Sequence, residues 1–178
     1  MRRGIFLVVL AVSFAAVGCA ASTVEVIPMG SAPILDGTLS EGEWDDAREI
    51  ALNDTLSLYL KRADGSIFIG ITARSVGVGS PCIVRGEEIL VLHASAALGT
   101  AVYLEDEGGW RADEDITWGS RRKGFSESAI REREAFFESE GWLATISYPG
   151  TPTHFEYRIA APEGILDVLF LFLEVEPE

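Results

Sequence analysis

The chain has 178 residues, of which 28 are acidic and 14 basic, so its net charge is −14 at neutral pH. This charge argues against nucleic-acid binding, because phosphate backbones are held by lysine and arginine, which gather here only at residues 121–123. Hydrophobic residues make up 48% of the chain. Length and composition together predict one folded domain with a sizeable core.

The N-terminus has the layout of an export signal. Two arginines precede an apolar run from Ile5 to Val17, and small residues follow up to Cys19. The run is shorter than the roughly 20 apolar residues of a membrane-spanning helix. The order Ala-Val-Gly-Cys over residues 16–19 resembles the bacterial lipobox, in which the cysteine becomes the lipidated first residue. We predict a signal peptide over residues 1–19 with lipidation at Cys19, and ordinary signal-peptidase cleavage nearby as the alternative.

Removal of this signal would leave a short tether over residues 20–23 and a single domain over residues 24–178. If Cys19 carries lipid, Cys82 is the one other cysteine, so no disulfide can form within the mature chain. Because of the signal peptide and the lipobox, we expect an exported protein anchored to a membrane of the cell envelope. Without the lipid it would be a periplasmic or secreted protein.

The domain opens with VEVIP, residues 24–28, whose alternation predicts a first strand. In the following stretch, APILDGTLSEGEWDDAREI, the Asp36-Gly37 pair predicts a chain reversal. Trp44 is expected to turn inward behind this reversal and to close one end of the core, because it buries a large apolar area. The carboxylates predict a short helix, whose dipole they would complement, and they are Glu41, Glu43, Asp45 and Asp46.

The clearest strand pattern is LSLYLKRADGSIFIGITA, residues 56–73. Apolar side chains alternate with others on both sides of Asp64-Gly65, which supplies the positive φ angles of a tight hairpin turn. The alternating residues are Leu58, Leu60, Ile67, Ile69 and Ile71. The pattern predicts an antiparallel hairpin with one buried face.

Further strands are predicted over residues 87–95, 99–105, 142–148, 154–160 and 168–175, with glycine and proline turns between them. Residues 126–141 have a helical period instead, and Gly141 would end that helix. Its buried face is expected to hold Ala129, Ile130, Phe136, Phe137 and the stem of Arg133. Seven or eight short strands with one or two short helices predict an all-β fold, an antiparallel β-sandwich of jelly-roll or immunoglobulin-like type.

The order Ile34-Leu35-Asp36-Gly37, Glu41, Trp44 and Ala47 resembles the N-terminal signature of family 9 carbohydrate-binding modules and related β-sandwich domains. The hairpin LYLKRADGSIFIGITA and the late segment FEYRIAAP are similar to further parts of that family, so the resemblance covers about three patches of the chain. It implies a sugar ligand held by aromatic rings, on which the C–H face of a pyranose packs while polar groups bond its hydroxyls.

The candidate ligand site is the polar loop EDEGGWRADEDITWGSRRKG, residues 105–124. Trp110 follows two glycines whose turn would present the ring outward, and Trp118 offers a second ring. A hairpin tip and strand-end packing are the respective structural alternatives. Tyr103 and Tyr148 are further aromatic candidates, whereas Trp142 is expected in a core strand. The side chains expected to bond hydroxyls are Arg111, Asp113, Asp115 and Arg121.

His93 lies in LHASAALGTAVY, where small side chains predict a narrow turn between two strands. A ligand pocket beside His93 and Ser95 is the alternative. We predict no cofactor, and haem is not favoured because few axial ligands are present. Calcium is the metal that the acidic loop fits best, since hard carboxylate oxygens suit it, although no EF-hand spacing occurs. Its candidate ligands are Glu105, Asp106, Glu107, Asp113 and Asp115.

No catalytic motif stands out. The chain contains no G-x-S-x-G elbow, H-E-x-x-H pair, Cys-x-x-Cys pair or phosphate-cradling glycine loop. Cys82 fits a buried small hydrophobe better than a nucleophile activated by His93. We predict a non-catalytic cell-envelope binding module for a carbohydrate or similar polar ligand. The alternative is a structural or protein-interaction lipoprotein of the same fold without a sugar ligand.

Overall fold

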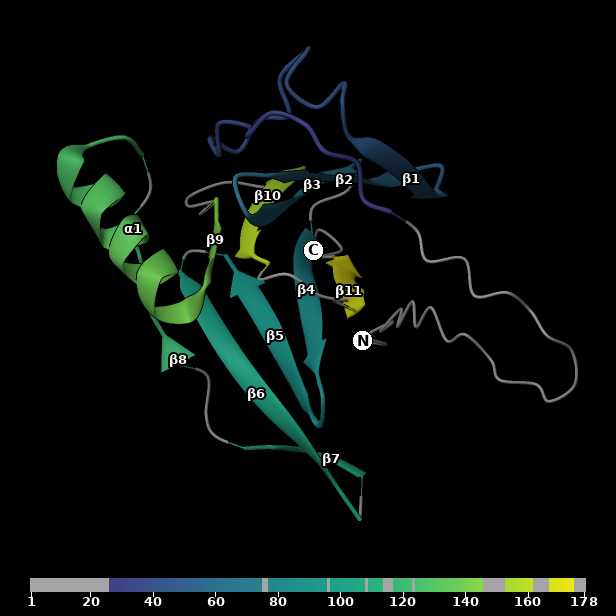
Figure 1. The fold of residues 1–178 in the computed structure, drawn as a ribbon, viewed down its shortest axis with the longest axis vertical. Helices are drawn as coiled ribbons and strands as arrows, with labels where there is room; N and C mark the ends of the chain where they lie inside the picture. The colour runs from purple at the N-terminus through teal and green to yellow at the C-terminus, as the bar shows by residue number, and fades with distance from the viewer. Residues whose placement is uncertain are drawn as a thin grey trace, which may run out of the picture.

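The computed structural model describes residues 26–74, 77–95, 97–107, 109–113, 117–122, 124–145, 153–161 and 167–174. Figure 1 shows the arrangement of these segments. Their elements, in chain order, are β1 (Arg48–Asn53), β2 (Leu56–Ala63), β3 (Ser66–Ala73), β4 (Gly77–Arg85), β5 (Glu88–Ala94), β6 (Leu98–Asp106), β7 (Gly109–Ala112), β8 (Thr117–Trp118), α1 (Glu127–Glu140), β9 (Trp142–Ala144), β10 (His154–Ala160) and β11 (Asp167–Glu174).

Two antiparallel sheets form the domain. The first has the order β1-β2-β3-β10-β9, and the second has the order β11-β4-β5-β6-β7 with β8 paired to β6. The sheets face each other, and α1 lies beside β9 and β8 at one side of the molecule (Figure 1). The predicted all-β sandwich is therefore confirmed.

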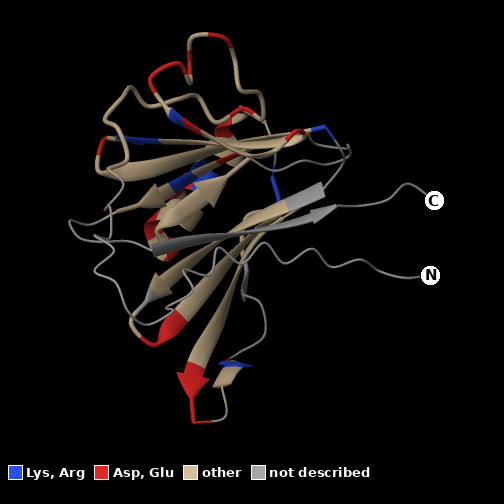
Figure 2. Ribbon diagram, turned by 90° about the vertical axis from the view of Figure 1, so that its right-hand side faces the viewer, with Lys and Arg blue, Asp and Glu red and all other residues tan. Residues whose placement is uncertain are grey.

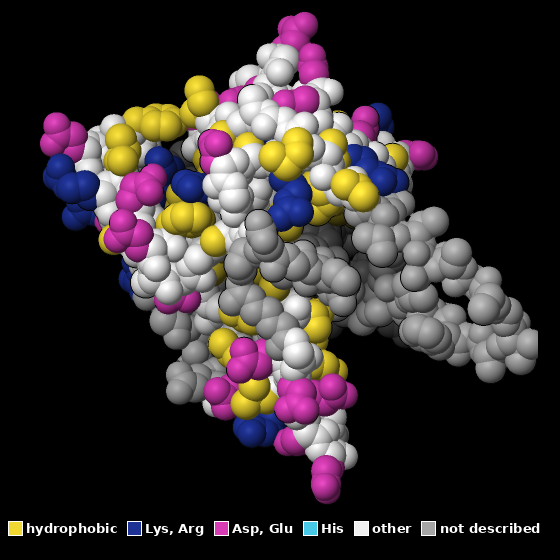
Figure 3. Space-filling view, viewed as in Figure 1, with side chains coloured by type: hydrophobic (Ala, Val, Ile, Leu, Met, Phe, Trp, Pro, Cys, Tyr) yellow, Lys and Arg dark blue, Asp and Glu magenta, His cyan; other side chains and the backbone are white. Residues whose placement is uncertain are grey.

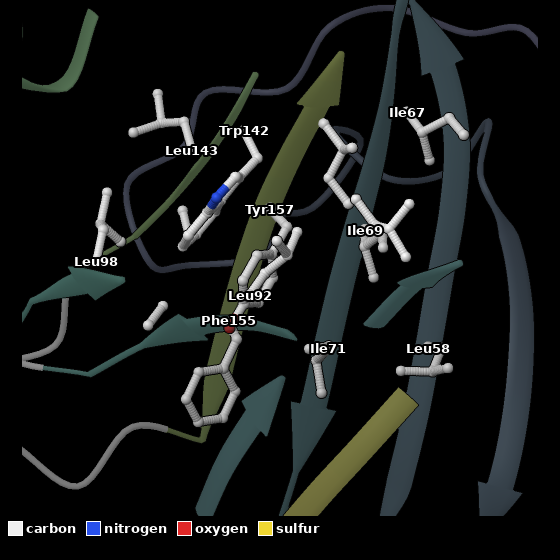
Figure 4. Close-up of a cluster of buried hydrophobic side chains, with 14 of the residues drawn as sticks. Leu58, Ile67, Ile69, Ile71, Leu92, Leu98, Trp142, Leu143, Phe155 and Tyr157 are labelled. Carbon is white, nitrogen blue, oxygen red and sulfur yellow. The ribbon is translucent and has the colours of Figure 1, made fainter. Parts of the chain in front are cut away.

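The core lies between the two sheets (Figure 4). Ile67, Ile69 and Ile71 point into it from alternate positions of β3 and are at most 3% exposed. Trp142 is 1% exposed, as predicted, and its ring stacks on that of Tyr157 at 6.2 Å between centroids. Burial of several large aromatic side chains in one cluster supplies much of the hydrophobic stabilisation.

Two hydrogen bonds between polar groups of the core link one sheet to the other. The hydroxyl of Tyr157 donates to the carbonyl of Gly79, and the indole Nε1 of Trp142 donates to Oγ1 of Thr100 at 2.8 Å. Thr100 donates in turn to Oε2 of Glu140 at 3.0 Å. Buried polar atoms need such partners, so these bonds fix how the sheets face each other.

The predicted hairpin of β2 and β3 is present, with Asp64 at φ 48° and Gly65 at φ 69° in its turn. The prediction of one buried face was wrong for β3, because Phe68 on the other face is only 3% exposed. The N-terminal segment, residues 26–47, covers this outer face (Figure 1). Trp44 packs there at 6% exposure, which confirms its predicted burial. Its predicted position at one end of the core was wrong, because it lies with Phe68 in a separate cluster on the outer face of the sheet.

The N-terminal segment itself differs from the prediction. Residues 26–28 form no strand, and Met29 makes an isolated parallel bridge with Arg62. Residues 41–46 form turns and bends instead of a helix. The physical reason is that their carboxylates bind backbone amides of the segment: Glu43 accepts the N–H of Ile34 at 2.5 Å, and Asp46 accepts that of Ser31 at 2.7 Å. Such local bonds compete with a helix.

Helix α1 begins and ends as predicted. Ser126 caps it by accepting the N–H of Ala129, and Gly141 ends it at φ 73°. Ala129 and Phe136 are buried, but Ile130 is 41% exposed, which corrects its predicted place on the buried face. Ile130 follows Ala129 directly, so its side chain points about 100° away from that of Ala129 around the helix axis. It lines a cleft between α1 and the N-terminal segment.

Candidate functional site

Strands β6 and β7 form a hairpin that extends beyond the rest of its sheet (Figure 1). Its register pairs Tyr103 with Ala112 and Glu105 with Trp110. Figure 2 shows acidic residues at the free end of this hairpin, where no second layer covers the ribbon. The predicted ligand loop therefore begins on a projecting hairpin.

Two exposed aromatic rings lie on one face of this hairpin. Trp110 is 46% exposed and Tyr103 is 37% exposed. Cross-strand partners share a face and side chains alternate along a strand, so Tyr103, Glu105 and Trp110 point to the same side. Diagonal neighbours of this kind have Cα atoms about 7–8 Å apart, within reach of aromatic side chains. The structure thus gives Trp110 a neighbouring ring, that of Tyr103.

Arg111 lies on the opposite face of the same hairpin, in register with Leu104. Its Nε is 2.9 Å from Oδ2 of Asp106 and its Nη1 is 3.9 Å from Oδ1 of Asp113, and all three side chains are exposed. Arg111 and Asp113, predicted to bond hydroxyls beside the Trp110 ring, are thus engaged with each other behind it. Asp115, the third charged residue predicted there, lies outside the described residues.

Trp118 does not lie beside Trp110. Its backbone, the part of this residue that the structure describes, pairs with Gly99 near the start of β6, whereas Trp110 pairs with Glu105. Six residues of strand separate these partners, which corresponds to about 20 Å. The two candidate tryptophans therefore lie at opposite ends of β6, and Trp110 is the one on the projecting hairpin.

Arg121 is exposed and lies near α1, because its backbone N–H donates to Oε1 of Glu132 at 2.8 Å. His93 is half-buried at the end of β5, where burial lowers the pKa of its imidazole, and its Nε2 is 2.9 Å from Oγ of Ser95. The narrow turn expected here is present, since the N–H of Ser95 donates to the carbonyl of Ala97 at 3.0 Å. Arg121 and His93 are therefore both remote from the tip of the β6–β7 hairpin.

A buried carboxyl group that the sequence did not indicate lies under the N-terminal segment. Glu156 is fully buried, and its Oε2 accepts the N–H groups of Asp36 at 2.9 Å and Gly37 at 2.7 Å. Its Oε1 has no hydrogen-bond partner among the described residues. Burial raises the pKa of Glu156 to about 7, against the lowering by the Gly37 amide. The group holds the Asp36-Gly37 reversal to β10.

Three other features bear on chemistry. Burial raises the pKa of the Cys82 thiol to about 11, so this thiol is protonated at neutral pH and a poor nucleophile. Among the residues that the structure describes, no group of three acidic, histidine or cysteine side chains is placed to hold a metal ion. In the same part of the chain, no helix has the length and apolar character needed to cross a bilayer.

A second candidate site, which is concave, lies between α1 and the N-terminal segment. Figure 3 shows hydrophobic and basic side chains side by side on this part of the molecule. We call it the helix cleft, and its apolar lining comprises Pro33, Leu35, Phe68, Phe125, Ile130 and Leu143. Arg133 and Arg158 also line it. Sequence reasoning missed this cleft because its walls come from five separate segments of the chain.

No known family, curated protein or solved structure matches this chain significantly. The geometry of the hairpin and of the helix cleft, together with the sequence motifs, is therefore what indicates a function.

Proposed function

We propose that this chain is a non-catalytic binding module of the cell envelope that holds a carbohydrate on the β6–β7 hairpin. The observation that carries the proposal is the adjacency of Tyr103 and Trp110 on one exposed face of a projecting ribbon. The C–H face of a pyranose packs on such rings, and Glu105 between them is an acceptor for sugar hydroxyls.

The charge of the hairpin favours a neutral glycan over an acidic one. Glu105, Asp106 and Glu107 are all exposed at its free end, and the chain as a whole carries a net charge of −14. A polyanionic glycan would be repelled from this surface. The resemblance of the N-terminal signature to family 9 carbohydrate-binding modules supports a sugar ligand independently of the hairpin.

Titration with neutral soluble polysaccharides, followed by tryptophan fluorescence, tests the proposal. Trp110→Ala is expected to lose about 1–3 kcal/mol of binding free energy, as hot-spot aromatics do. Its thermal stability is expected to stay nearly unchanged, because the ring is half exposed. Tyr103→Ala is expected to weaken binding as well. Arg111→Ala, on the opposite face of the same strand, is the matched control and is expected to bind normally.

Each contrary outcome has a definite meaning. If the Trp110→Ala protein is folded and binds undiminished, the ligand lies elsewhere and the hairpin assignment is wrong. A flat response of the native protein across neutral and acidic glycans would contradict sugar binding altogether. It would favour the alternative, a structural or protein-interaction lipoprotein that uses the same aromatic face on a protein partner.

The envelope location is a separate part of the proposal and rests on the lipobox at Cys19, which lies outside the described residues. Cys19→Ser is expected to move the protein from the membrane fraction to the soluble fraction of its host. Several acyl chains on the native residue would anchor it firmly, since each buried methylene contributes about 0.8 kcal/mol. A variant that stays with the membranes would show that any anchor lies elsewhere.

A further inference from the structure

The helix cleft encloses about 260 Å³ between the N-terminal segment, the turn after β2, α1 and β10. This volume is slightly below the roughly 300–1,000 Å³ of typical ligand pockets, so it suits a small molecule. Phe125 at its rim is 61% exposed, and Ile130 beside it is 41% exposed. Exposed apolar side chains around a concavity are typical of a binding site.

Aromatic rings hold the two guanidinium groups that line the cleft. The guanidinium carbon of Arg158 lies 4.0 Å from the centroid of Phe137, and its Nε is 3.3 Å from Oγ of Ser66. The guanidinium carbon of Arg133 lies 5.8 Å from the centroid of Phe125. Stacking of this kind restrains a planar guanidinium, so its donors are preorganised for a ligand.

Within the described part of the chain, neither arginine has an ion-pair partner, although Asp64 and Glu134 also line the cleft. The Nε of Arg133 is buried and has no hydrogen-bond acceptor there. A buried donor without a partner is costly, and native structures usually supply a protein or water acceptor. The Nη groups of Arg133 are not among these buried atoms and have no hydrogen-bond partner among the described residues, so they are the donors of this guanidinium that a ligand in the cleft can reach.

We propose that the helix cleft binds a small hydroxylated carboxylate, such as a sugar acid, as a site separate from the β6–β7 hairpin. The carboxylate pairs with Arg133, and Arg158 supplies the second basic group, because a planar carboxylate matches the guanidinium fork. Hydroxyl groups of the ligand donate to Asp64 and Glu134, and its C–H surface packs on Phe125. The two acidic residues disfavour a dianion such as phosphate.

The experiment is a titration of the mature chain with D-glucuronate, followed by calorimetry and by the NMR resonance of the Arg133 Nε–H group. D-glucose, which lacks the carboxylate, and inorganic phosphate are titrated in parallel. We expect glucuronate to shift the Arg133 resonance and to bind at least about tenfold more tightly than either, the typical effect of a charge-assisted hydrogen bond.

Variants then locate the site. Arg133→Gln and Arg158→Gln are each expected to weaken glucuronate binding about tenfold or more. Arg131→Gln is the matched control, since this helix residue is 71% exposed and pairs with Glu127 away from the cleft. Trp110→Ala is expected to leave glucuronate binding unchanged, which separates this site from the proposed glycan platform. Melting curves identify any variant that fails to fold.

Three results would overturn the assignment. The absence of both binding heat and a shift of the Arg133 resonance would mean that no carboxylate binds in the helix cleft. Equal affinity for phosphate and glucuronate would show that the cleft binds anions in general and does not select a carboxylate. Undiminished binding in folded Arg133→Gln and Arg158→Gln proteins would place the glucuronate site elsewhere.

Discussion

The fully buried ammonium of Lys61 lies 2.9 Å from Oδ1 of Asp46, and this ion pair ties the N-terminal segment to β2. Lys61 also donates to the carbonyl of Glu43 and lies 4.9 Å from the ring centroid of Trp44. The amide of Ser31, and after it the hydrogen bond from Lys61, hold the pKa of Asp46 at about 2. The acidic residues of this stretch are thus tethers for the chain.

Asp46→Asn should destabilise the protein because it leaves the Lys61 charge buried without its counter-charge. We expect a loss of about 2–3 kcal/mol in the free energy of unfolding, below the 3–5 kcal/mol typical of a fully buried pair. The reduction reflects the 37% exposure of the Asp46 side chain. Urea unfolding at pH 7 measures the loss. Glu127→Gln, which breaks the exposed pair with Arg131, is the control, and equal midpoints for both variants would contradict the prediction.

Glu156 should make stability depend on pH in the weakly acidic range. Its pKa is raised from 4.5 to about 7 in the folded protein, so the folded state holds a proton that the unfolded state releases. Its contribution to stability is therefore full below pH 4.5, falls as the pH rises from there to about 7, and is absent above. A shift of this size corresponds to roughly 3 kcal/mol.

Comparison of the native protein with Glu156→Gln isolates this effect. The amide oxygen of glutamine can still accept the N–H groups of Asp36 and Gly37, but the side chain does not titrate. As the pH rises from 4.5 to 7, the free energy of unfolding of the variant, measured by denaturant titration, should increase relative to that of the native protein. A constant difference across this range would show that Glu156 is ionised throughout. The lowered pKa of His93 acts in both proteins and cancels in the difference.

Trp44→Ala should cost about 3–5 kcal/mol of folding free energy, the usual range for a buried large aromatic. The ring fills the space over β3, where Gly70 leaves room for it. A Cβ on Gly70 would lie 3.1 Å from Cζ3 of Trp44 and 2.9 Å from Cδ2 of Leu39. Gly70→Ala should consequently destabilise by about 1–3 kcal/mol through overpacking. Unchanged denaturation midpoints would mean that the N-terminal segment is only loosely attached.

Periodicity in the sequence predicts much of this fold and fails at identifiable places. The hairpin around Asp64-Gly65 and the helix ending at Gly141 follow from local patterns. Strand β4 does not, because its glycines, Ser80 and Pro81 indicate a turn. Pro81 lies opposite Phe170 in the β4–β11 pairing, but the β4–β5 pairing begins only at Cys82, so no N–H of residue 81 is needed on the β5 side.

The candidate sites depend even more on register and on tertiary contacts. The two glycines before Trp110 indicate an exposed ring, but the identity of its neighbour follows from the pairing of Glu105 with Trp110. A single sequence does not specify that pairing. The helical pattern predicts the stem of Arg133 on the buried face, but only the packing of α1 against the sheet places its guanidinium in one cleft with Arg158.

Gly119→Ala tests the packing of α1 at a position that is itself exposed. A Cβ there would lie 2.1 Å from Cδ2 and Cε2 of Phe136, which is 6% exposed. The ring cannot easily move away, because it packs against Trp142 in a T-shaped arrangement with 5.0 Å between the ring centroids. We expect a loss of about 1–3 kcal/mol, measured by urea denaturation.

A double-mutant cycle with Phe136→Ala decides whether this loss comes from the predicted clash. Removing the ring costs stability on its own, about 3–5 kcal/mol for a buried phenylalanine, but it frees the space that the new methyl group needs. Gly119→Ala should then cost almost nothing in the Phe136→Ala background, and the coupling between the two positions should approach the full single-mutant loss. Additive effects would mean that Gly119 acts through its own backbone, and that α1 can shift on the sheet without disturbing Trp142.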